Sequence, residues 1–153
     1  MSKKHRDADL ILKLYDLRRE KTMREARNWF FTFNPQTPAD FMDVLTSDKS
    51  GLYRMVVSYW EMAASLVNHG AIDAEMFNDA NGEHLFVYAK LEPFIPAMRE
   101  EMGSPQFLEH LEKVVKEIPE YETKLNAIRE RIQKIVEIYQ QRAAAQAAAA
   151  SGD

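Results

Sequence analysis

The sequence has no cysteine and only five glycines among its 153 residues. Without cysteine there are no disulfides, no thiolate zinc sites, no iron–sulfur ligands and no cysteine nucleophile. With so few glycines, the chain contains neither G-x-G-x-x-G nor G-x-x-x-x-G-K-[ST], the strings that cradle phosphates in nucleotide-binding folds. A chain of this length buries a core without such supports, and we expect a single domain over residues 1–153.

The signatures of catalytic and metal sites are missing as well. None of the four histidines stands in H-E-x-x-H, in a Glu-x-x-His pair, or three or four residues from another histidine. No serine lies in a G-x-S-x-G elbow. We therefore expect no catalytic residue, no metal site and no cofactor, and a protein that is not an enzyme.

The formal net charge of −4 is unevenly spread along the chain. Residues 1–33 carry nine Lys or Arg against five Asp or Glu, residues 34–110 carry four against twelve, and residues 111–153 carry seven of each. An acidic middle segment disfavours contact with a phosphate backbone, so we do not expect nucleic acid as a partner. A nucleic-acid partner would have to use the basic residues of the first segment: Lys3, Lys4, Arg6, Arg18, Arg19, Lys21, Arg24 and Arg27.

Long apolar runs are also absent from the sequence. The basic start of the chain leads into Leu10–Leu12, which is far shorter than the apolar stretch of a signal peptide. The longest uncharged run of the body, Met62–Ile72, is too short to span a bilayer. We expect a cytoplasmic protein that does not associate with a membrane.

Apolar residues recur at spacings of three and four in nearly every segment, and no stretch alternates with a period of two. The pattern predicts an all-α protein, a helical bundle of about six helices with long N- and C-terminal helices. Residues 34–118 should form the body, and residues 1–33 and 119–142 the two terminal helices. Residues 143–153 are rich in alanine and have nothing large to bury, so we expect a frayed tail.

Two places in this pattern predict a bend or a break. Leu10, Leu14 and Leu17 share a face of the first helix that lies about 110° from the apolar group between residues 23 and 33. This helix must either kink near Arg19–Thr22 or pack its two halves on different surfaces. Further along, two prolines predict a kink or a break near Glu92–Ile95.

The clearest amphipathic pattern covers Leu52–His69. Its apolar arc is so wide that the helix needs neighbours on at least two sides, which predicts a central position. Glu61 lies at the centre of the polar strip that remains. Two interpretations stay open: Glu61 is a surface carboxylate, or another helix covers the strip and supplies Arg99 or Arg54 as its partner.

The last helix carries a narrow apolar stripe whose 4-3 spacing is typical of a coiled-coil seam. Leaving its large side chains in water would forgo about 10 kcal/mol, so something must cover them. The stripe of matching length is the first apolar group of the N-terminal helix. We favour pairing of the two stripes across chains, in a homodimer, over pairing within one chain. The expected interface residues are Leu10, Leu14, Leu17, Leu125, Ile128, Ile132, Ile135 and Tyr139.

Several short motifs together resemble those of one protein family. They are Tyr59–Ala64 followed by Val67, then Gly70–Asp73, Leu85–Arg99 and Phe107–Leu111. This order of an aromatic-x-Glu helix, a Gly-x-Ile-Asp turn and a Pro/Arg helix is similar to a bacterial and phage family known as domain of unknown function 4760. The resemblance covers roughly residues 52–115. It implies an all-helical fold without an established reaction, and special roles for Glu61, Gly70, Asp73 and Arg99.

These observations favour a non-enzymatic helical module for protein interaction or scaffolding, with a protein as its partner. The alternative is a small-molecule or peptide sensor with a pocket near Trp60 and Glu61. Glu61 or Arg99 would supply the polar contact of that pocket. Its aromatic wall would consist of Tyr59, Trp60, Phe86 and Tyr88. The residues expected to bind are Tyr59, Trp60, Glu61, Asp73 and Arg99.

Overall fold

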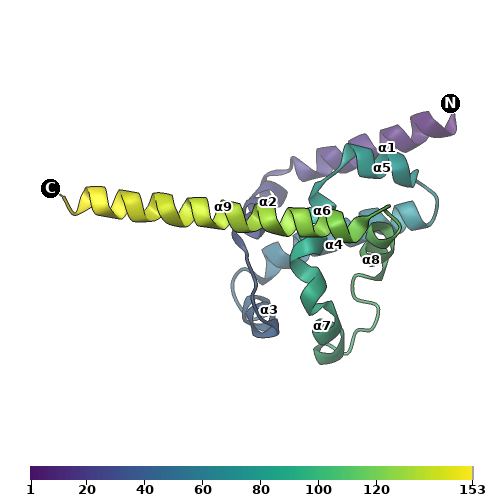
Figure 1. Cartoon of the computed structure of the whole chain (residues 1–153). Helices are drawn as coiled ribbons and strands as arrows, with labels where there is room; N and C mark the ends of the chain where they lie inside the picture. The colour runs from purple at the N-terminus through teal and green to yellow at the C-terminus, as the bar shows by residue number, and fades with distance from the viewer. Residues whose placement is uncertain (153) are drawn as a thin grey trace.

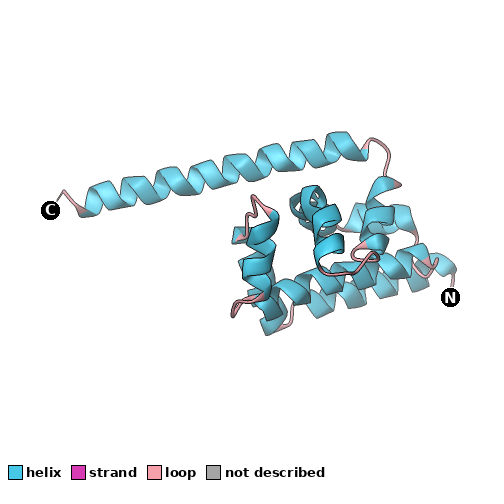
Figure 2. Cartoon of the chain, turned by 90° about the horizontal axis from the view of Figure 1, so that it is seen from below, coloured by secondary structure: helices cyan, strands magenta, loops and turns pink. Residues whose placement is uncertain are grey.

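The computed structural model describes residues 1–152, which are helical apart from short loops and turns (Figure 1, Figure 2). The all-α prediction is confirmed, although the described chain has more helices than the six or so expected. The elements are α1 (Lys3–Arg18), α2 (Lys21–Thr32), α3 (Pro38–Leu45), α4 (Ser50–Asn68), α5 (Ala74–Ala80), α6 (Glu83–Leu91), the 3-10 helix η1 (Glu92–Phe94), α7 (Ile95–Glu101), α8 (Glu109–Lys116) and α9 (Tyr121–Ala150).

The long helix predicted over residues 1–33 is divided into α1 and α2. The division confirms the kink expected near Arg19–Thr22. The side chain of Glu20 caps α2 by accepting a hydrogen bond from the backbone N–H of Met23 at 2.8 Å. Because of this break the two apolar groups face different neighbours: α1 packs against α5, whereas α2 packs against α4.

α4 is the centre of the core. Val56, Trp60 and Ala63 on this helix are completely buried. α4 packs against α2 and also against α8, so its wide apolar arc has the two neighbours that the sequence pattern requires. Gly70, with a φ of +77°, follows the helix in a conformation that glycine adopts without steric cost.

The second half of the body contains a break and a strained residue. α6 and α7 are separated by η1, where Pro93 lacks a backbone donor, and this confirms the break expected near Glu92–Ile95. After α7 the chain passes through residues 102–108 to α8. Leu108 precedes α8 with a φ of +58°, an uncommon conformation for a residue with a side chain, and is 2% exposed.

α9 is the longest helix, with 30 residues. It packs along α6, whereas its C-terminal half projects beyond the other helices (Figure 1, Figure 2). The frayed tail expected over residues 143–153 is wrong as far as residue 150, because α9 continues to Ala150. Alanine has the highest helix propensity, so the run extends a helix that packing has already nucleated. Asp153 lies outside the described residues.

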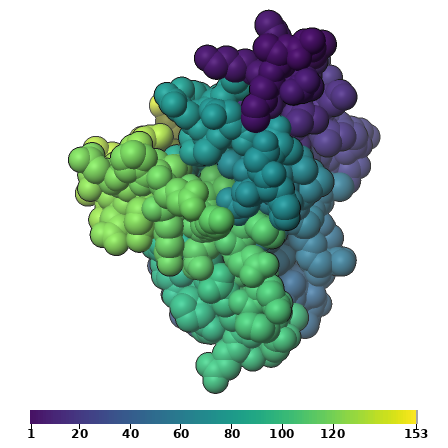
Figure 3. Space-filling model, turned by 90° about the vertical axis from the view of Figure 1, so that its right-hand side faces the viewer, coloured from purple at the N-terminus to yellow at the C-terminus, as the bar shows by residue number. Residues whose placement is uncertain are grey.

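α1 lies at one end of the body. Figure 3 shows α1 (purple) against the α5 region on one face, with the segment around residues 100–110 (green) at the opposite end. None of the helices within residues 1–152 has both the length and the apolar character that a membrane crossing requires.

Candidate functional site

Trp60 lies in a packed core and not beside a pocket. Its side chain is 0% exposed, and the rings of Tyr59 and His84 lie 4.9 and 5.6 Å from its own. Tyr88 is buried as well, and Phe86 lines a groove next to α9. The aromatic wall predicted for a pocket near Trp60 and Glu61 is therefore wrong, because Tyr59, Trp60 and Tyr88 are packed into the core.

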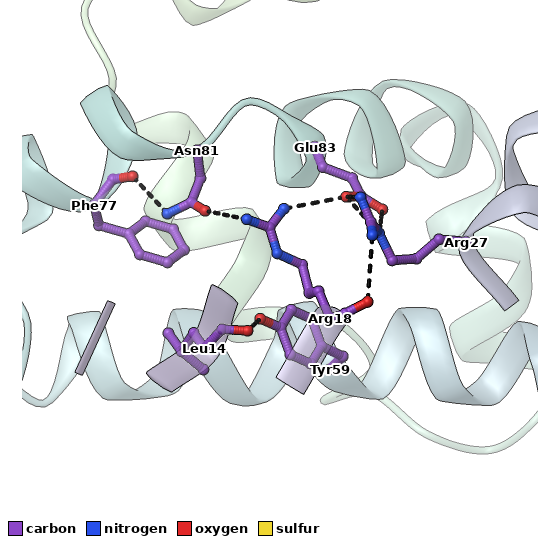
Figure 4. A network of polar contacts seen from close by, with 7 residues as sticks. All are labelled: Leu14, Arg18, Arg27, Tyr59, Phe77, Asn81 and Glu83. Carbon is purple, nitrogen blue, oxygen red and sulfur yellow. Dashed lines mark hydrogen bonds and ion pairs between the residues drawn. The ribbon is translucent and has the colours of Figure 1, made fainter. Parts of the chain in front are cut away.

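A charged cluster next to this core joins the first two helices to α5 and α6 (Figure 4). The Glu83 carboxylate accepts hydrogen bonds from Arg18 Nη1 at 3.3 Å and from Arg27 Nε at 3.0 Å. Arg18 also donates to Asn81 Oδ1 at 3.4 Å, and its guanidinium lies 5.2 Å from the centre of the Trp60 ring. Two of the cations considered for nucleic acid are thus engaged within the chain.

His84 is completely buried in the same region. Its Nε2 lies 2.8 Å from Asn78 Oδ1, and its Nδ1 has no hydrogen-bond partner among residues 1–152. Burial, reinforced by the positive charge of Arg18, lowers the pKa of His84 to about 4, so the imidazole is neutral near pH 7. The described chain brings no three His, Asp or Glu side chains together in a group that could hold a metal ion.

Glu61 closes the N-terminus of α8. Its Oε1 accepts a hydrogen bond from the backbone N–H of Leu111 at 2.8 Å, and its Oε2 accepts one from His110 at 3.2 Å. These N–H groups have no partner inside the helix, and the helix dipole also favours a carboxylate there. Burial raises the pKa of Glu61, and the two hydrogen bonds oppose that shift. The polar strip of α4 is therefore covered at Glu61, with backbone groups as the partners.

Arg99 supports the same segment from α7. Its Nε donates to the backbone carbonyl of Phe107 at 2.9 Å, and its Nη2 lies 3.5 Å from Oε1 of Glu112. Of the two open interpretations of Glu61, the ion pair with Arg99 is therefore wrong, because Arg99 pairs with Glu112, and no ion pair joins Glu61 to Arg54 among the described residues. Glu61 and Arg99 are linked only through residues 107–111, which both of them hold in place.

Asp73 has a structural role at the start of α5. Its Oδ1 accepts a hydrogen bond from the backbone N–H of Met76 at 2.9 Å, and its own N–H donates to Asp7 Oδ2 at 2.9 Å. Asp7 is 3% exposed and also pairs with Lys3 at 2.6 Å. Asp73 therefore belongs to the contact between α1 and α5, whereas Glu61 and Arg99 hold the start of α8.

Glu61 also borders a groove of about 570 Å³, which we call the Glu61 groove. α4 forms one wall, α7 and the segment before α8 form another, and the end of α3 completes it. The apolar residues that line it are Leu45, Val57, Met98, Met102, Phe107 and Leu108. The polar residues that line it are Tyr53, Arg54, Ser58, Glu61 and Ser104.

A second groove, of about 410 Å³, lies between α9 and the body, and we call it the α9 groove. On the body side, the rings of Phe31 and Phe86 stack with their centres 5.6 Å apart. α9 contributes the opposite wall, which consists of Ile132, Ile135, Val136, Tyr139 and Gln140.

Lys90 lines the α9 groove but is only 6% exposed. Its Nζ donates to the backbone carbonyls of Phe30, Phe31 and Phe33 at 2.9, 2.9 and 2.6 Å. These carbonyls lie at and just after the C-terminus of α2, where the helix dipole favours a cation. The Phe30 carbonyl also accepts a hydrogen bond from the backbone N–H of Phe33 at 3.1 Å. Burial lowers the pKa of Lys90 to about 8. Lys90 thus closes the end of α2 as Glu61 closes the start of α8.

Sequence reasoning missed Lys90, although the pattern contained a signal for it. Lys90 stands at the helical spacing of Val87, Leu91 and Phe94, so it occupies a position in an apolar stripe. Charged residues are rarely buried unless they are paired, and a lysine in such a stripe therefore indicates a buried charge with polar partners. The partner carbonyls belong to the backbone of a distant segment, and every residue has such a carbonyl. The sequence therefore could not show which residues Lys90 contacts.

The interface residues predicted on α1 are largely used within the chain. Leu14 is 6% exposed, and its carbonyl accepts a hydrogen bond from the Tyr59 hydroxyl (Figure 4). Leu10 packs partly against the core, and Leu17 is 55% exposed. Within the described chain this stripe does not pair with the last helix, because α1 packs against α5 and Leu14 contacts Tyr59 of α4. Pairing of the two stripes across chains stays a prediction.

The interface residues predicted on α9 change from buried to exposed along the helix. Leu125 is buried and Ile128 packs partly against the core. Ile132 and Ile135 are half-buried beside the α9 groove, and Tyr139 is 63% exposed. The body covers the first part of the seam and leaves the last part open.

Comparison with known proteins identifies the family of this chain. The family described as Domain of unknown function (DUF4760) matches residues 5–118, and the chain belongs to this family. The match includes most of α1 and all of α2 to α8, and it ends before α9 begins. No curated protein and no solved structure matches the chain.

Proposed function

We propose that the chain is a non-enzymatic protein-interaction module that forms a homodimer through the middle of α9, around Ile132–Tyr139. The observation that carries the proposal is the exposure of large apolar side chains where α9 leaves the body. Ile138 is 52% exposed, Tyr139 is 63% exposed and Phe31 is 43% exposed. Exposed apolar side chains gathered beside a groove are typical of protein-interaction surfaces.

The α9 groove gives this surface a shape that a helix can enter. A helix laid beside α9 would cover Ile138 and place an apolar side chain next to the stacked rings of Phe31 and Phe86. A second copy of the chain presents such a helix in its own α9. A two-fold arrangement would allow each copy to cover the exposed side chains of the other.

The charges on α9 support pairing between two copies of this helix. In an antiparallel pair centred between residues 135 and 136, Lys134 of each copy would face Glu137 of the other. Ile132 of each copy would face Tyr139 of the other in the same arrangement. Opposite charges at the edge of an apolar seam favour one orientation over the alternatives.

This proposal keeps the expected homodimer and moves its interface to α9 alone, since Leu14 is buried within its own chain. As parts of the same proposal, the partner is a protein and neither a nucleic acid nor a membrane, and the module acts in the cytoplasm. The absence of recognisable catalytic motifs supports a binding function over an enzymatic one.

Light scattering on the full-length chain tests the proposal. We expect twice the mass of one chain at high micromolar concentration, and the mass of a single chain for the double variant Ile138→Asp/Tyr139→Asp. Both substituted residues are exposed, so helicity by circular dichroism should not change.

The matched control is Leu12→Asp/Leu17→Asp on α1, where the two side chains are 62% and 55% exposed. We expect this control to remain a dimer. A monomeric wild-type chain, or dissociation by the α1 control and not by the α9 variant, would contradict the proposal.

A further inference from the structure

The polar strip of α4 divides into a covered part and an open part. α8 covers the C-terminal part, where Glu61 accepts hydrogen bonds from the backbone of α8 and Asn68 donates to the carbonyl of His110 at 3.1 Å. In the N-terminal part, Arg54 and Ser58 line the Glu61 groove. The groove therefore has a polar wall on α4 that faces the apolar side chains of α7 and of the segment before α8.

The two ends of this polar wall carry opposite charges. Arg54 and Glu61 are seven residues apart on α4, which places their Cα atoms about 10 Å apart on one face of the helix. Arg54 is exposed and forms no ion pair with another residue of the described chain. Glu61 accepts two backbone hydrogen bonds, and a carboxylate has room for about four. Burial raises the pKa of Glu61, so a nearby cation would stabilise its charged form.

The Tyr53 side chain lines the same groove, and its hydroxyl is enclosed behind the groove wall. Its side chain is 3% exposed, and its hydroxyl finds no hydrogen-bond partner within residues 1–152. A buried hydroxyl without a partner is unfavourable by comparison with a bonded one.

The apolar wall of the Glu61 groove has flexible side chains on a backbone that is held in place. Met98 and Met102 line it, and methionine fits occupants of different shape because its side chain is unbranched and flexible. Met102 is 52% exposed, so an occupant would remove apolar surface from water. The backbone behind this wall is held by Arg99 at Phe107 and by Glu61 at the start of α8. The groove is therefore formed before anything binds.

We propose that the Glu61 groove binds a short apolar peptide with free ends, whose ammonium group pairs with Glu61 and whose carboxylate pairs with Arg54. Three residues in an extended conformation span about 10 Å, which matches the separation of the Arg54 and Glu61 Cα atoms along α4. A groove of about 570 Å³ also has room for three residues with apolar side chains. This site uses none of the residues of the α9 surface. The peptide-binding proposal and the homodimer proposal can therefore be tested independently.

Calorimetric titration of the full-length chain with three related peptides tests the proposal. The probes are the tripeptide Leu-Val-Leu with free ends, the same peptide with an acetylated N-terminus, and the same peptide with an amidated C-terminus. We expect the free peptide to bind, and either modification to weaken binding about tenfold, because each removes one charge-assisted contact.

Two variants assign each end of the peptide to its partner. In Glu61→Gln, acetylation should no longer change the affinity, whereas amidation should still weaken it. In Arg54→Gln the pattern should reverse. Because each comparison is made between two peptides on one variant, a general loss of stability cannot imitate this crossed pattern. The control variant Glu130→Gln lies on the exposed side of α9 and should behave as wild type.

Three results would overturn the proposal. The first is that the free peptide does not bind at millimolar concentration. The second is that the acetylated or amidated peptide binds wild type as tightly as the free peptide. The third is that Glu61→Gln and Arg54→Gln weaken all three peptides equally, which would leave Glu61 and Arg54 with structural roles only.

Discussion

Glu61 and Lys90 perform the same task with opposite charge. Glu61 closes the N-terminus of α8 with a carboxylate, and Lys90 closes the C-terminus of α2 with an ammonium group, each as the helix dipole favours. They differ in burial: Lys90 is 6% exposed and gives all three donors to carbonyls, whereas Glu61 is half-buried and borders an open groove. Lys90 has all three donors engaged, so its replacement loses contacts and it has no donor left for a ligand. Glu61 accepts two hydrogen bonds and can accept more, so it can hold α8 and also bind a ligand.

The largest effect is expected when Lys90 is replaced by methionine. Lys90→Met leaves the three carbonyls at the end of α2 without their buried partner and should lower the free energy of unfolding by about 4 kcal/mol. Urea unfolding followed by circular dichroism measures this loss. The control Lys113→Met removes an exposed lysine and should change stability by less than about 0.5 kcal/mol. If both variants lost the same free energy of unfolding, the burial of Lys90 would make no difference to stability and the prediction would be wrong.

A pH titration extends the comparison to His84, a completely buried side chain that is held neutral. Its pKa is lowered to about 4 from 6.5, so the unfolded chain takes up a proton as the pH falls below 6.5 and the folded chain does not. Stability should therefore fall between pH 6.5 and pH 4, by about 3 kcal/mol in total. In His84→Phe this part of the pH dependence should be absent. Parallel stability curves for the two proteins would show that His84 titrates normally in the fold.

The smallest effect is expected at Glu61, because it is only half-buried. Glu61→Ala removes the cap of α8 and should lower the free energy of unfolding by about 1–2 kcal/mol. Since Arg99 holds the same segment through the Phe107 carbonyl, the double variant Glu61→Ala/Arg99→Ala should lose at least about 0.5 kcal/mol less than the sum of the single losses. Urea unfolding of all four proteins gives this coupling. Strictly additive losses would mean that the two residues act on separate parts of the chain.

Helices and their breaks could be predicted because they depend on neighbours in the sequence. The spacing of apolar residues located α4. The prolines at 93 and 96 located the break at η1. Each of these signals acts within about one turn of helix. The positions of these helices and breaks can therefore be read from residues that are close together in the sequence.

The packing of these helices could not be predicted because it depends on distant residues. Leu14 and Leu125 belong to stripes that look equivalent in sequence, yet one faces α4 and α5 and the other faces α6. The special role of Glu61 was suggested by its place in the polar strip of the central helix and by a family resemblance, but its partners are N–H groups, which every residue except proline carries. The groove beside Glu61 depends on a contact between α4 and the segment before α8, more than 40 residues later.

The projecting part of α9 also acts mechanically, as a stiff spacer. At 1.5 Å per residue, the stretch after Glu137 reaches about 20 Å from the body, and its alanines favour a straight helix over a flexible tether. A flexible chain of the same length would let a partner at its tip point in any direction. A helix fixes both the distance and the orientation, so whatever is held near Ala150 follows each rotation of the body.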